Sequence, residues 1–579
     1  MHVIATAGHV DHGKSALVRT LTGMEPDRWA EERRRGMTID LGYAWTALPS
    51  GAQLAFVDVP GHERFIGNML AGVGPVTAVL FVVAADEGWC AQSAEHLAAV
   101  DALRLRHGLL AVTRSDLADP AAALDEARRR IAETSLGRVD VVAVSAVTGA
   151  GVPELGTALD RLVTRLPPPD RAAPLRLWVD RAFTVRGSGT VVTGTLGAGT
   201  VAVGDRLEVS GRPVRVRALQ CLGQPCQRVV AVARVALNLR GVAAANVGRG
   251  DVLVEPGAWH WTSTVDVRID QQSPRLANPV VHVGTAALPV RLRHFDAVHA
   301  RVTLPRPLPL RAGDRAILRD PGQPSVFGLL VLDADPPALH RRGAAARRAT
   351  QLATATGCPD ARAEVARRGA VRRRHLDALG VTLGEPGDMR EVAGWLVAAG
   401  AWQAWLVTLP AAVDEWHATS PLDAGVPLEA LRRRLGIPDR DLLKPLIAEA
   451  GLSVQDGRVL RPGRDVSLVP GVDIVCARLE RAPFAAPERD ELDALGLARR
   501  ELAAAERAGR LLRISDDVVL LPSAPEAAMQ TLRPLAQPFT TSQARKALGT
   551  TRRVAIPLLE YLDAHGFTER VDQLTRRVR

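Results

Sequence analysis

The 579-residue chain is poor in aromatic residues, cysteine and lysine, and each shortage narrows its chemistry. Aromatic residues make up 4% of the sequence, so base stacking on an aromatic surface is not an expected way of binding RNA. None of the five cysteines stands in a CxxC pair, which argues against a zinc site, and an odd, scattered set is typical of reduced thiols. Lysine occurs three times among 73 Lys and Arg residues, so each lysine position needs an explanation.

Long apolar runs are also missing. The longest, VTAVLFVVAA at residues 76–85, has about half the length that a membrane-spanning helix needs. The N-terminus has no positively charged start followed by an apolar core, as a signal peptide would have. We therefore expect a soluble, cytoplasmic protein with no membrane partner.

What the chain has in excess is length and positive charge. Its length exceeds what one hydrophobic core supports and predicts roughly four or more domains. The formal net charge of +10 favours a polyanionic partner, most often nucleic acid. The arginine excess can equally reflect a compositional bias of the whole chain, so the total charge alone does not decide between the two.

Residues 8–15, GHVDHGKS, match the phosphate-loop pattern GxxxxGK[ST] between a strand-like and a helix-like run. Gly8 and Gly13 let the backbone curl until its N–H groups point at phosphates. Lys14 places a compact ammonium between the β- and γ-phosphates, and Ser15 can bind Mg²⁺. A planar guanidinium is wider and would not fit the same space, which explains the lysine. The other loop residues are His9, Val10, Asp11 and His12.

Further polar residues follow in the order of a guanine-nucleotide site. Thr38 is suited to bind Mg²⁺ when a γ-phosphate is present. Asp58, at the end of an apolar strand, can hold the metal through water, and Gly61 can offer its N–H to the γ-phosphate. His62 is placed to orient the attacking water. The expected metal ligands are Ser15, Thr38 and Asp58.

The base is expected beside two later strand ends. Asp116 follows an apolar strand, and its carboxylate matches the N1–H and N2–H₂ edge of guanine. The backbone of Ser145 and Ala146 can contact the base oxygen O6. Apolar strands alternate with helical stretches over the first 170 residues, which predicts a doubly wound parallel sheet.

The stretches GHVDHGKS, GMTID and DVPGH together resemble the translational GTPases of the elongation factor Tu kind. The resemblance implies that Val10 and Met37 form an apolar gate around the catalytic water, which His62 enters when the ribosome triggers hydrolysis. Where the family has Asn and Lys in its base-reading motif, this chain has Thr113 and Arg114. The guanine-reading aspartate is retained and Arg114 can stack on the base, so we expect GTP binding with an altered affinity.

Two β-barrels should follow the GTPase domain, which we expect at residues 1–170 and which ends in the proline linker LPPPD. Beyond the linker, short strands are broken by glycine turns. GSGTVVTG at residues 187–194 resembles the GxGTVVTG stretch that recurs in the second domain of translational GTPases. The predicted ranges are 171–257 for the barrel with the amino-acid pocket and 258–340 for the next barrel. In the family these barrels hold the acceptor end of an aminoacyl-tRNA.

The remainder of the chain repeats one plan of helix, turn, helix and hairpin, which is typical of winged-helix modules. The predicted modules are 341–409, 410–464, 465–523 and 524–579. A helical solenoid or scaffold is the alternative for any single module, and repetition favours an array. The expected fold is thus multidomain: an α/β P-loop GTPase domain, two β-barrel domains and tandem winged-helix (α+β) modules.

An elongation factor Tu-like body followed by winged-helix modules resembles the bacterial selenocysteine-specific elongation factors over the full length. The resemblance implies a monomer that uses GTP and Mg²⁺ to deliver selenocysteinyl-tRNA to the ribosome at UGA codons marked by an mRNA hairpin, with ribosome-triggered hydrolysis. Two alternatives stay open. A translational GTPase with a different tRNA cargo leaves the tail unexplained, and a GTP-switched nucleic-acid-binding regulator leaves the barrels unexplained.

Arg181 and Arg234 occupy positions that look like the amino-acid pocket of the second domain, where the general elongation factor has asparagine in place of Arg234. A selenol is ionised at neutral pH and a serine hydroxyl is not, so a pocket that prefers selenolate should be cationic. Asp180 would orient one of the two arginines. The alternative is that both are ordinary surface arginines in an arginine-rich chain.

The mRNA hairpin is expected on the last module, 524–579. Arg545 and Lys546 would end one helix, and Arg552 and Arg553 would open the next, whose N-terminus suits phosphates. The apolar residues of this second helix are expected to face the module core and to leave the arginines outside. These apolar residues are Val554, Ile556, Leu558, Leu559 and Leu562.

Overall fold

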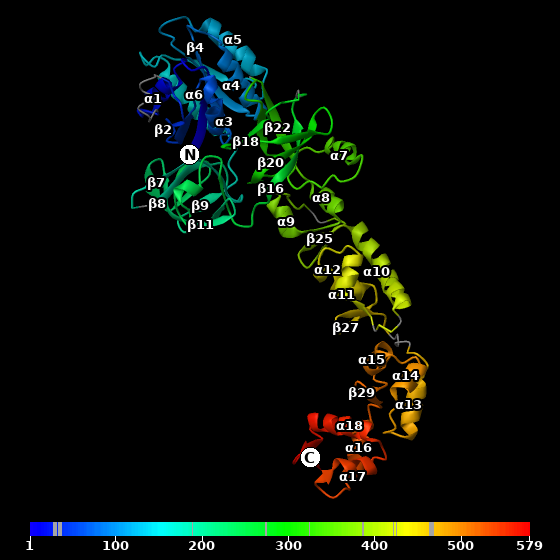
Figure 1. The fold of residues 1–579 in the computed structure, drawn as a ribbon. Helices are drawn as coiled ribbons and strands as arrows, with labels where there is room; N and C mark the ends of the chain where they lie inside the picture. The colour runs from blue at the N-terminus through cyan, green and yellow to red at the C-terminus, as the bar shows by residue number, and fades with distance from the viewer. Residues whose placement is uncertain are drawn as a thin grey trace. The chain divides into compact units, whose positions relative to one another are not determined.

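The computed structural model describes residues 1–26, 32, 37–187, 189–272, 275–323, 325–384, 387–420, 422–423, 425–462 and 468–579. They form two compact units, residues 1–387 and residues 388–579 (Figure 1). No helix of the described part is long and apolar enough to cross a membrane. The first unit contains an α/β domain and two barrels, and the second consists of small modules of helices and hairpins.

The first domain is a six-stranded sheet with helices on both faces. Its strand order is β2 (Gly42–Ala47), β3 (Gln53–Asp58), β1 (His2–Ala7), β4 (Ala78–Ala84), β5 (His107–Thr113) and β6 (Asp140–Ala143). Neighbouring strands are parallel except for the edge strand β2, which is antiparallel to β3. The helices are α1 (Lys14–Thr22), η1 (Glu63–Phe65), α3 (Ile66–Val73), α4 (Ala91–Ala102), α5 (Ala121–Ala132) and α6 (Val152–Arg165).

Alternate strand residues build a separate core on each face of this sheet. Ile4 packs in one core with Leu17 of α1 and Leu159 of α6. Val3 packs in the other core, to which Leu97 of α4 also belongs. Burial of both faces confirms the predicted doubly wound sheet. The loops that follow the carboxyl ends of β1, β3 and β5 are left at one edge, where open α/β sheets bind ligands.

Two β-barrels follow the α/β domain in the first unit (Figure 1). The first has the strand order β10 (Arg206–Val209), β15 (Val252–Val254), β7 (Arg176–Val185), β8 (Gly189–Leu196), β14 (Ala233–Arg240), β11 (Arg212–Cys221) and β12 (Gln224–Cys226), and β10 also pairs with β11. It also carries β9 (Thr200–Ala202), β13 (Arg228–Val230) and η2 (Ala244–Asn246). The second has the order β18 (Ala286–Pro289), β17 (Val280–Val283), β21 (Arg315–Arg319), β22 (Val326–Asp333), β16 (Trp261–Ile269), β20 (His299–Pro309) and β19 (Arg291–His294).

The segment after the second barrel remains attached to it. Its elements are α7 (Ala344–Leu352), α8 (Ala361–Arg368), β23 (Ala370–Arg372) and α9 (Arg373–Ala378). The buried Arg348 of α7 pairs with Asp266, at 2.7 Å, and with Asp333, both of which belong to the barrel. The predicted module 341–409 is therefore not a unit of its own, because its residues up to Gly387 belong to the first unit.

The second unit begins with β24 (Arg390–Val392), β25 (Trp395–Val397) and α10 (Ala399–Thr419). A winged-helix arrangement follows in β26 (Val426–Pro427), α11 (Leu428–Arg434), α12 (Arg440–Glu449), β27 (Ser453–Gln455) and β28 (Arg458–Leu460). Because α10 is continuous, the predicted boundary between residues 409 and 410 falls inside a helix. The predicted boundary between residues 464 and 465 lies outside the described residues.

The last two modules share one hydrophobic core. The first of them contains α13 (Gly471–Arg481), α14 (Arg489–Ala494), α15 (Arg499–Arg507), β29 (Leu512–Ser515) and β30 (Val518–Leu520). The second contains α16 (Ala524–Leu532), β31 (Phe539–Thr540), α17 (Thr541–Ala547), α18 (Arg552–Ala564), β32 (Thr568–Arg570) and β33 (Thr575–Val578). Its hairpin β32–β33 and strand β31 form a three-stranded sheet beside the two helices, as the winged-helix prediction requires.

Helix α18 confirms most of the predicted core positions. Val554, Leu558, Leu559 and Leu562 are at most 2% exposed, whereas Ile556 is 42% exposed. The prediction for Ile556 was wrong because residues 554, 558 and 562 form an i, i+4 stripe. A residue two positions after Val554 lies about 200° around the helix from it and faces away from the stripe.

Candidate functional site

The phosphate loop joins β1 to α1 in a conformation that needs glycine. Gly8 has φ +131° and Gly13 has φ +78°, values that side chains rarely allow. A Cβ at position 8 would overlap the carbonyl oxygen of Val82 on β4. The loop borders a cavity of about 470 Å³, whose lining from this region is Val10, Asp11, Gly13, Lys14, Ser15 and Ala16. Most of the predicted loop residues therefore line one cavity, whereas Gly8, His9 and His12 do not.

Lys14 is almost fully buried at the first turn of α1, with 3% exposure. Its ammonium donates hydrogen bonds to the carbonyl oxygens of Gly8 (3.1 Å) and His9 (2.6 Å). A Cβ at Gly61 would lie 2.5 Å from the Lys14 nitrogen, so the loop that carries Gly61 closes over it. The ammonium is thus confined to a narrow space beside the cavity.

The three predicted metal ligands lie together. Ser15 Oγ donates a hydrogen bond to Asp58 Oδ2 at 2.6 Å and lies 2.9 Å from Thr38 Oγ1. Thr6 Oγ1 donates to the other carboxylate oxygen of Asp58 at 2.7 Å. Burial raises the pKa of Asp58, and the hydrogen bond from Ser15 opposes that shift. This cluster of hydroxyl and carboxylate oxygens fits the ligand preference of Mg²⁺.

The predicted catalytic residues lie in two groups. Val10 and Met37 line the cavity, together with Thr38 and Gly61. His62 precedes helix η1, and its Nδ1 accepts a hydrogen bond from the backbone N–H of Arg64 at 3.2 Å. His62 is not part of the cavity lining. The two apolar gate residues therefore share the cavity, whereas His62 lies outside its lining.

The base-side residues are held by the ends of β5 and β6. The Thr113 hydroxyl donates to the His12 carbonyl oxygen at 2.7 Å and so supports the phosphate loop from below. Arg114 lines the cavity and donates to Asp86 (2.9 Å) and Glu87 (2.7 Å). The predicted base-contacting residues Asp116 (exposed), Ser145 (buried) and Ala146 (half-buried) do not line the cavity.

Several residues of this site could not be found from spacing. His96 of α4 is buried, and its Nδ1 accepts the backbone N–H of Gly8 at 3.1 Å. Burial lowers the pKa of His96 to about 3, so the ring is neutral and can accept. Glu32 lines the cavity and accepts the backbone N–H groups of Ile39 (3.1 Å) and Asp40 (3.0 Å). His96 is 88 residues away from Gly8 in the sequence, and Glu32 itself lies outside the motifs that the sequence shows.

A second cluster combines the predicted residues of the first barrel with a tyrosine from the α/β domain. Asp180 on β7 accepts two hydrogen bonds from the Arg234 guanidinium on β14, one of them 2.8 Å long. The guanidinium carbon of Arg234 lies 3.8 Å from the ring centre of Tyr43, and that of Arg181 lies 4.9 Å from it. Burial raises the pKa of Tyr43. Both arginines line a cavity of about 230 Å³ beside Phe183.

This arginine cluster is connected to the segment that follows Thr38. Arg181 donates to the carbonyl oxygen of Leu41 and lies 3.6 Å from the Asp40 carboxylate. Arg249 also pairs with Asp40 and donates to the Asp180 carbonyl oxygen at 3.0 Å. Residues 40 and 41 therefore contact the arginines directly, two residues beyond a predicted metal ligand.

The four residues predicted to contact the mRNA hairpin differ in their contacts within the protein. Arg545 and Lys546 end α17, and Arg552 begins α18. None of these three makes a side-chain hydrogen bond or an ion pair within the described residues. Arg553 instead donates to the carbonyl oxygens of Ala486 (2.7 Å) and Asp517 (2.6 Å) in the preceding module. The expectation that Arg553 lies outside was wrong, because its guanidinium joins the two modules.

Comparisons with known proteins agree with this architecture. The family described as the elongation factor Tu GTP binding domain matches residues 1–165, and that described as elongation factor SelB, winged helix, matches residues 531–577. The selenocysteine-specific elongation factor of Escherichia coli K12 is 34% identical over 611 residues, which cover 98% of this chain and 97% of the relative. The chain belongs to the selenocysteine-specific elongation factors. The corresponding factor of Desulfomicrobium baculatum is 38% identical over 339 residues, covering 55% of this chain and 53% of the relative.

A solved structure extends the match to the fold of the selenocysteine-specific elongation factors. The crystal structure of the bacterial factor EF-Sec aligns over 100% of this chain and 99% of that chain, with 28% identity and a TM-score of 0.77. The predicted family and fold class are confirmed, and the chain is a translational GTPase that hydrolyses GTP. GTP is therefore the ligand of the domain that carries the phosphate loop.

Proposed function

We propose that this GTPase carries selenocysteinyl-tRNA to the ribosome at UGA codons marked by an mRNA hairpin, and that the ribosome triggers GTP hydrolysis. The observation that carries the proposal is the pair of arginines beside the 230 Å³ cavity. A selenocysteine-specific factor must distinguish a selenolate from the hydroxyl of a seryl precursor on the same tRNA. Fixed positive charge at the amino-acid pocket provides that distinction, because only the selenolate is ionised at neutral pH.

At the nucleotide site, Lys14 and the loop N–H groups would bind the phosphates. Ser15, Thr38 and Asp58 would hold Mg²⁺, directly or through water, and the ion would neutralise phosphate charge when it is bound. Lys14 would exchange its two carbonyl partners for phosphate oxygens. Arg114 and Asp116 would contact the base, and His62 would turn from its hydrogen bond with Arg64 to orient the attacking water.

At the amino-acid pocket, Asp180 keeps the Arg234 guanidinium in place through two hydrogen bonds. Arg181 has the carbonyl oxygen of Leu41 and the Asp40 carboxylate as partners. A γ-phosphate that draws Thr38 toward Mg²⁺ would move the neighbouring residues 40 and 41. We infer that this movement changes the contacts of Arg181, and so links the state of the nucleotide to tRNA binding.

At the C-terminal end, Arg545, Lys546 and Arg552 offer basic side chains on two adjacent helices of the last module. The groove of a double-helical RNA is too narrow for a helix, so contact with the backbone and with a bulged or looped base is expected. Charge of this kind gives affinity, and the looped base gives specificity.

Sequencing of the RNA that co-purifies with the GTP-loaded protein tests the proposal. We expect the selenocysteine tRNA and a hairpin-containing messenger to be enriched over total RNA. Enrichment of another tRNA would favour a factor with a different cargo, and enrichment of duplex DNA in a parallel capture would favour a GTP-switched regulator. In a direct comparison on one tRNA body, equal binding of the selenocysteinyl and seryl forms would contradict the role of the pocket.

A further inference from the structure

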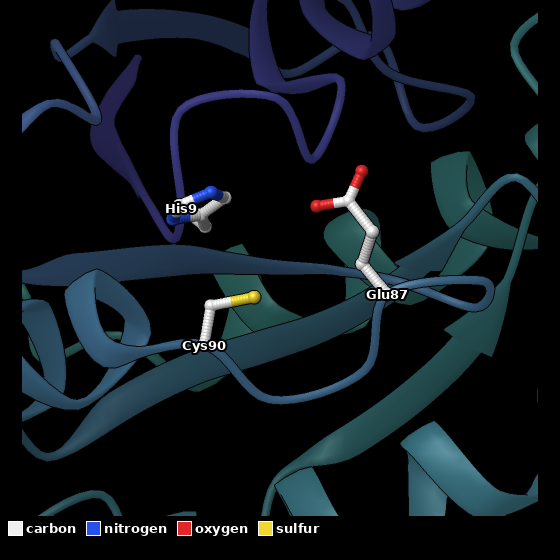
Figure 2. A group of neighbouring side chains, drawn as sticks. All are labelled: His9, Glu87 and Cys90. Carbon is white, nitrogen blue, oxygen red and sulfur yellow. The ribbon is translucent and has the colours of Figure 1, made fainter.

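A cluster of metal-ligating side chains lies behind the phosphate loop and is not needed for any step proposed above. His9 and His12 belong to the loop, Glu87 lies in the turn after β4, and Cys90 is the residue before α4. One ligand atom each of His9, Glu87 and Cys90 lies within 4.8 Å of the others. Figure 2 shows these three side chains around a shared space, with the Glu87 carboxylate turned toward His9.

His12 adds a fourth ligand to this cluster. Its Nε2 lies 3.5 Å from Cys90 Sγ and 3.7 Å from Glu87 Oε2. Bonds of about 2.0–2.3 Å to nitrogen, oxygen and sulfur in a tetrahedron place neighbouring ligand atoms about 3.3–3.8 Å apart. The two distances from His12 therefore match the edges of a tetrahedral zinc site. The ligand atom of His9 lies within 4.8 Å of those of Glu87 and Cys90, so it would have to move closer to them by up to about 1 Å.

The surroundings of His9 and His12 favour neutral rings, which is the form that binds a metal ion. His12 is fully buried, and its Nδ1 lies 3.4 Å from the Val82 carbonyl oxygen. A ring N–H that donates to a backbone carbonyl is the usual support of a metal-binding histidine, and it leaves Nε2 free to ligate. Burial lowers the pKa of His12 to about 4 and also lowers that of His9. His9 Nδ1 is buried and has no hydrogen-bond partner within the described residues.

The remaining two side chains keep a free ligand atom. Glu87 Oε1 accepts from Arg114 at 2.7 Å, while Oε2 is the oxygen that faces His12. Burial, followed by the Glu87 carboxylate, raises the pKa of Cys90, so the thiol carries its proton until an ion displaces it. Binding would convert the thiol to a metal-bound thiolate with the release of one proton.

We propose that His9, His12, Glu87 and Cys90 bind one divalent transition-metal ion of the zinc class behind the phosphate loop. Two imidazoles, a carboxylate and a thiolate form a ligand set of zinc sites, whereas Mg²⁺ prefers oxygen ligands alone. Two ligands come from the loop and two from the β4–α4 connection. A bound ion would therefore tie the loop to that connection, and we expect it to slow the release of GDP, whose phosphates the loop would hold.

Titration of the metal-free, GDP-loaded full-length protein with Co²⁺ and Zn²⁺ tests the site. We expect one ion per chain and, for Co²⁺, a sulfur-to-cobalt charge-transfer band that reports the thiolate. Cys90→Ser should abolish the band and weaken Zn²⁺ binding by about 10–100-fold or more. Glu87→Gln should weaken binding but keep the band. Cys226→Ser, in the first barrel, is the matched control and should behave as the unmodified protein.

Release of a fluorescent GDP analogue gives a second measurement. One equivalent of Zn²⁺ should slow release several-fold from the unmodified protein and from Cys226→Ser, but not from Cys90→Ser. A charge-transfer band that survives in Cys90→Ser, or unmodified protein that binds no ion stoichiometrically, would overturn the site. Stoichiometric binding with an unchanged rate of GDP release would overturn the effect on the loop.

Discussion

Arg234 is the residue that most directly tests discrimination between the two amino acids. Arg234→Asn removes a guanidinium that lies beside the cavity and is held by Asp180. Binding of selenocysteinyl-tRNA should weaken by about 1.5–3 kcal/mol, the usual loss for a hydrogen bond to a charged group. Binding of the seryl form should change much less. Competition binding with both forms on the same tRNA body measures the difference.

Arg240→Asn, on the same strand but exposed, is the control for Arg234→Asn. It should leave the preference for the selenocysteinyl form unchanged. If Arg234→Asn weakens both forms equally, the arginine only touches the shared tRNA body. A measurement of thermal unfolding accompanies the binding data, because the substitution also removes a partner of the buried Asp180.

Arg348 tests the attachment of α7 to the barrel. Arg348→Met leaves the fully buried Asp266 with Arg301 as a remaining partner at 2.7 Å, and it removes a partner of Asp333. Breaking a buried ion pair by removing one member costs about 3–5 kcal/mol. Urea unfolding followed by circular dichroism should show an earlier transition. Arg347→Met, exposed on the same helix, should shift it by no more than about 0.5 kcal/mol.

The residues that sequence reasoning located are those with fixed spacing. Lys14, Ser15 and Asp58 follow from motifs whose separation is set by a strand, a turn and a helix. Tyr43 and His96 were not predicted because their partners come from other strands or domains. Such long-range contacts cannot be inferred from the type of a single residue. The zinc-class cluster escaped for the same reason, since its ligands come from two separate loops.

At the scale of elements, two arginines that are adjacent in the sequence of α18 have different surroundings. Arg552 is exposed and Arg553 joins the preceding module through carbonyl oxygens. Arg552→Ala should weaken hairpin binding and flatten its salt dependence, because one phosphate contact is lost. It should spare GTP hydrolysis and tRNA binding. Filter binding of the hairpin at several salt concentrations measures the effect.

Arg553→Ala is the paired variant and should act on stability. It removes charge-assisted hydrogen bonds of a half-buried side chain, and we expect a loss of about 1.5–3 kcal/mol of stability with little change in the salt dependence of RNA binding. A reversed outcome, with Arg553→Ala abolishing salt-dependent binding and Arg552→Ala neutral, would contradict the assignment. The helix ends were predictable from charge and periodicity, whereas the direction of the Arg553 side chain depends on the neighbouring module.

At the scale of the whole molecule, the proposed triggering of GTP hydrolysis by the ribosome predicts a slow isolated protein. His62 is held by the Arg64 N–H and does not line the cavity, so the isolated protein should turn over slowly. His62→Ala should leave GTP and tRNA binding intact and lower ribosome-stimulated turnover by about 10²–10⁴-fold. Single-turnover assays with and without ribosomes give the comparison. Full stimulation of the variant would remove His62 from the mechanism.

Because Gly61 lies so close to Lys14, the residue type that one position tolerates depends on the residue at the other. Arginine dominates the basic positions of this chain, since lysine fills only three of 73. Drift toward arginine at position 14 would drive a wider cation against the backbone at Gly61, and any Cβ at position 61 would lie 2.5 Å from the ammonium and from Val10 Cα. Neither position can change first without loss of the site. The preference for arginine that marks the rest of the chain therefore does not extend to position 14.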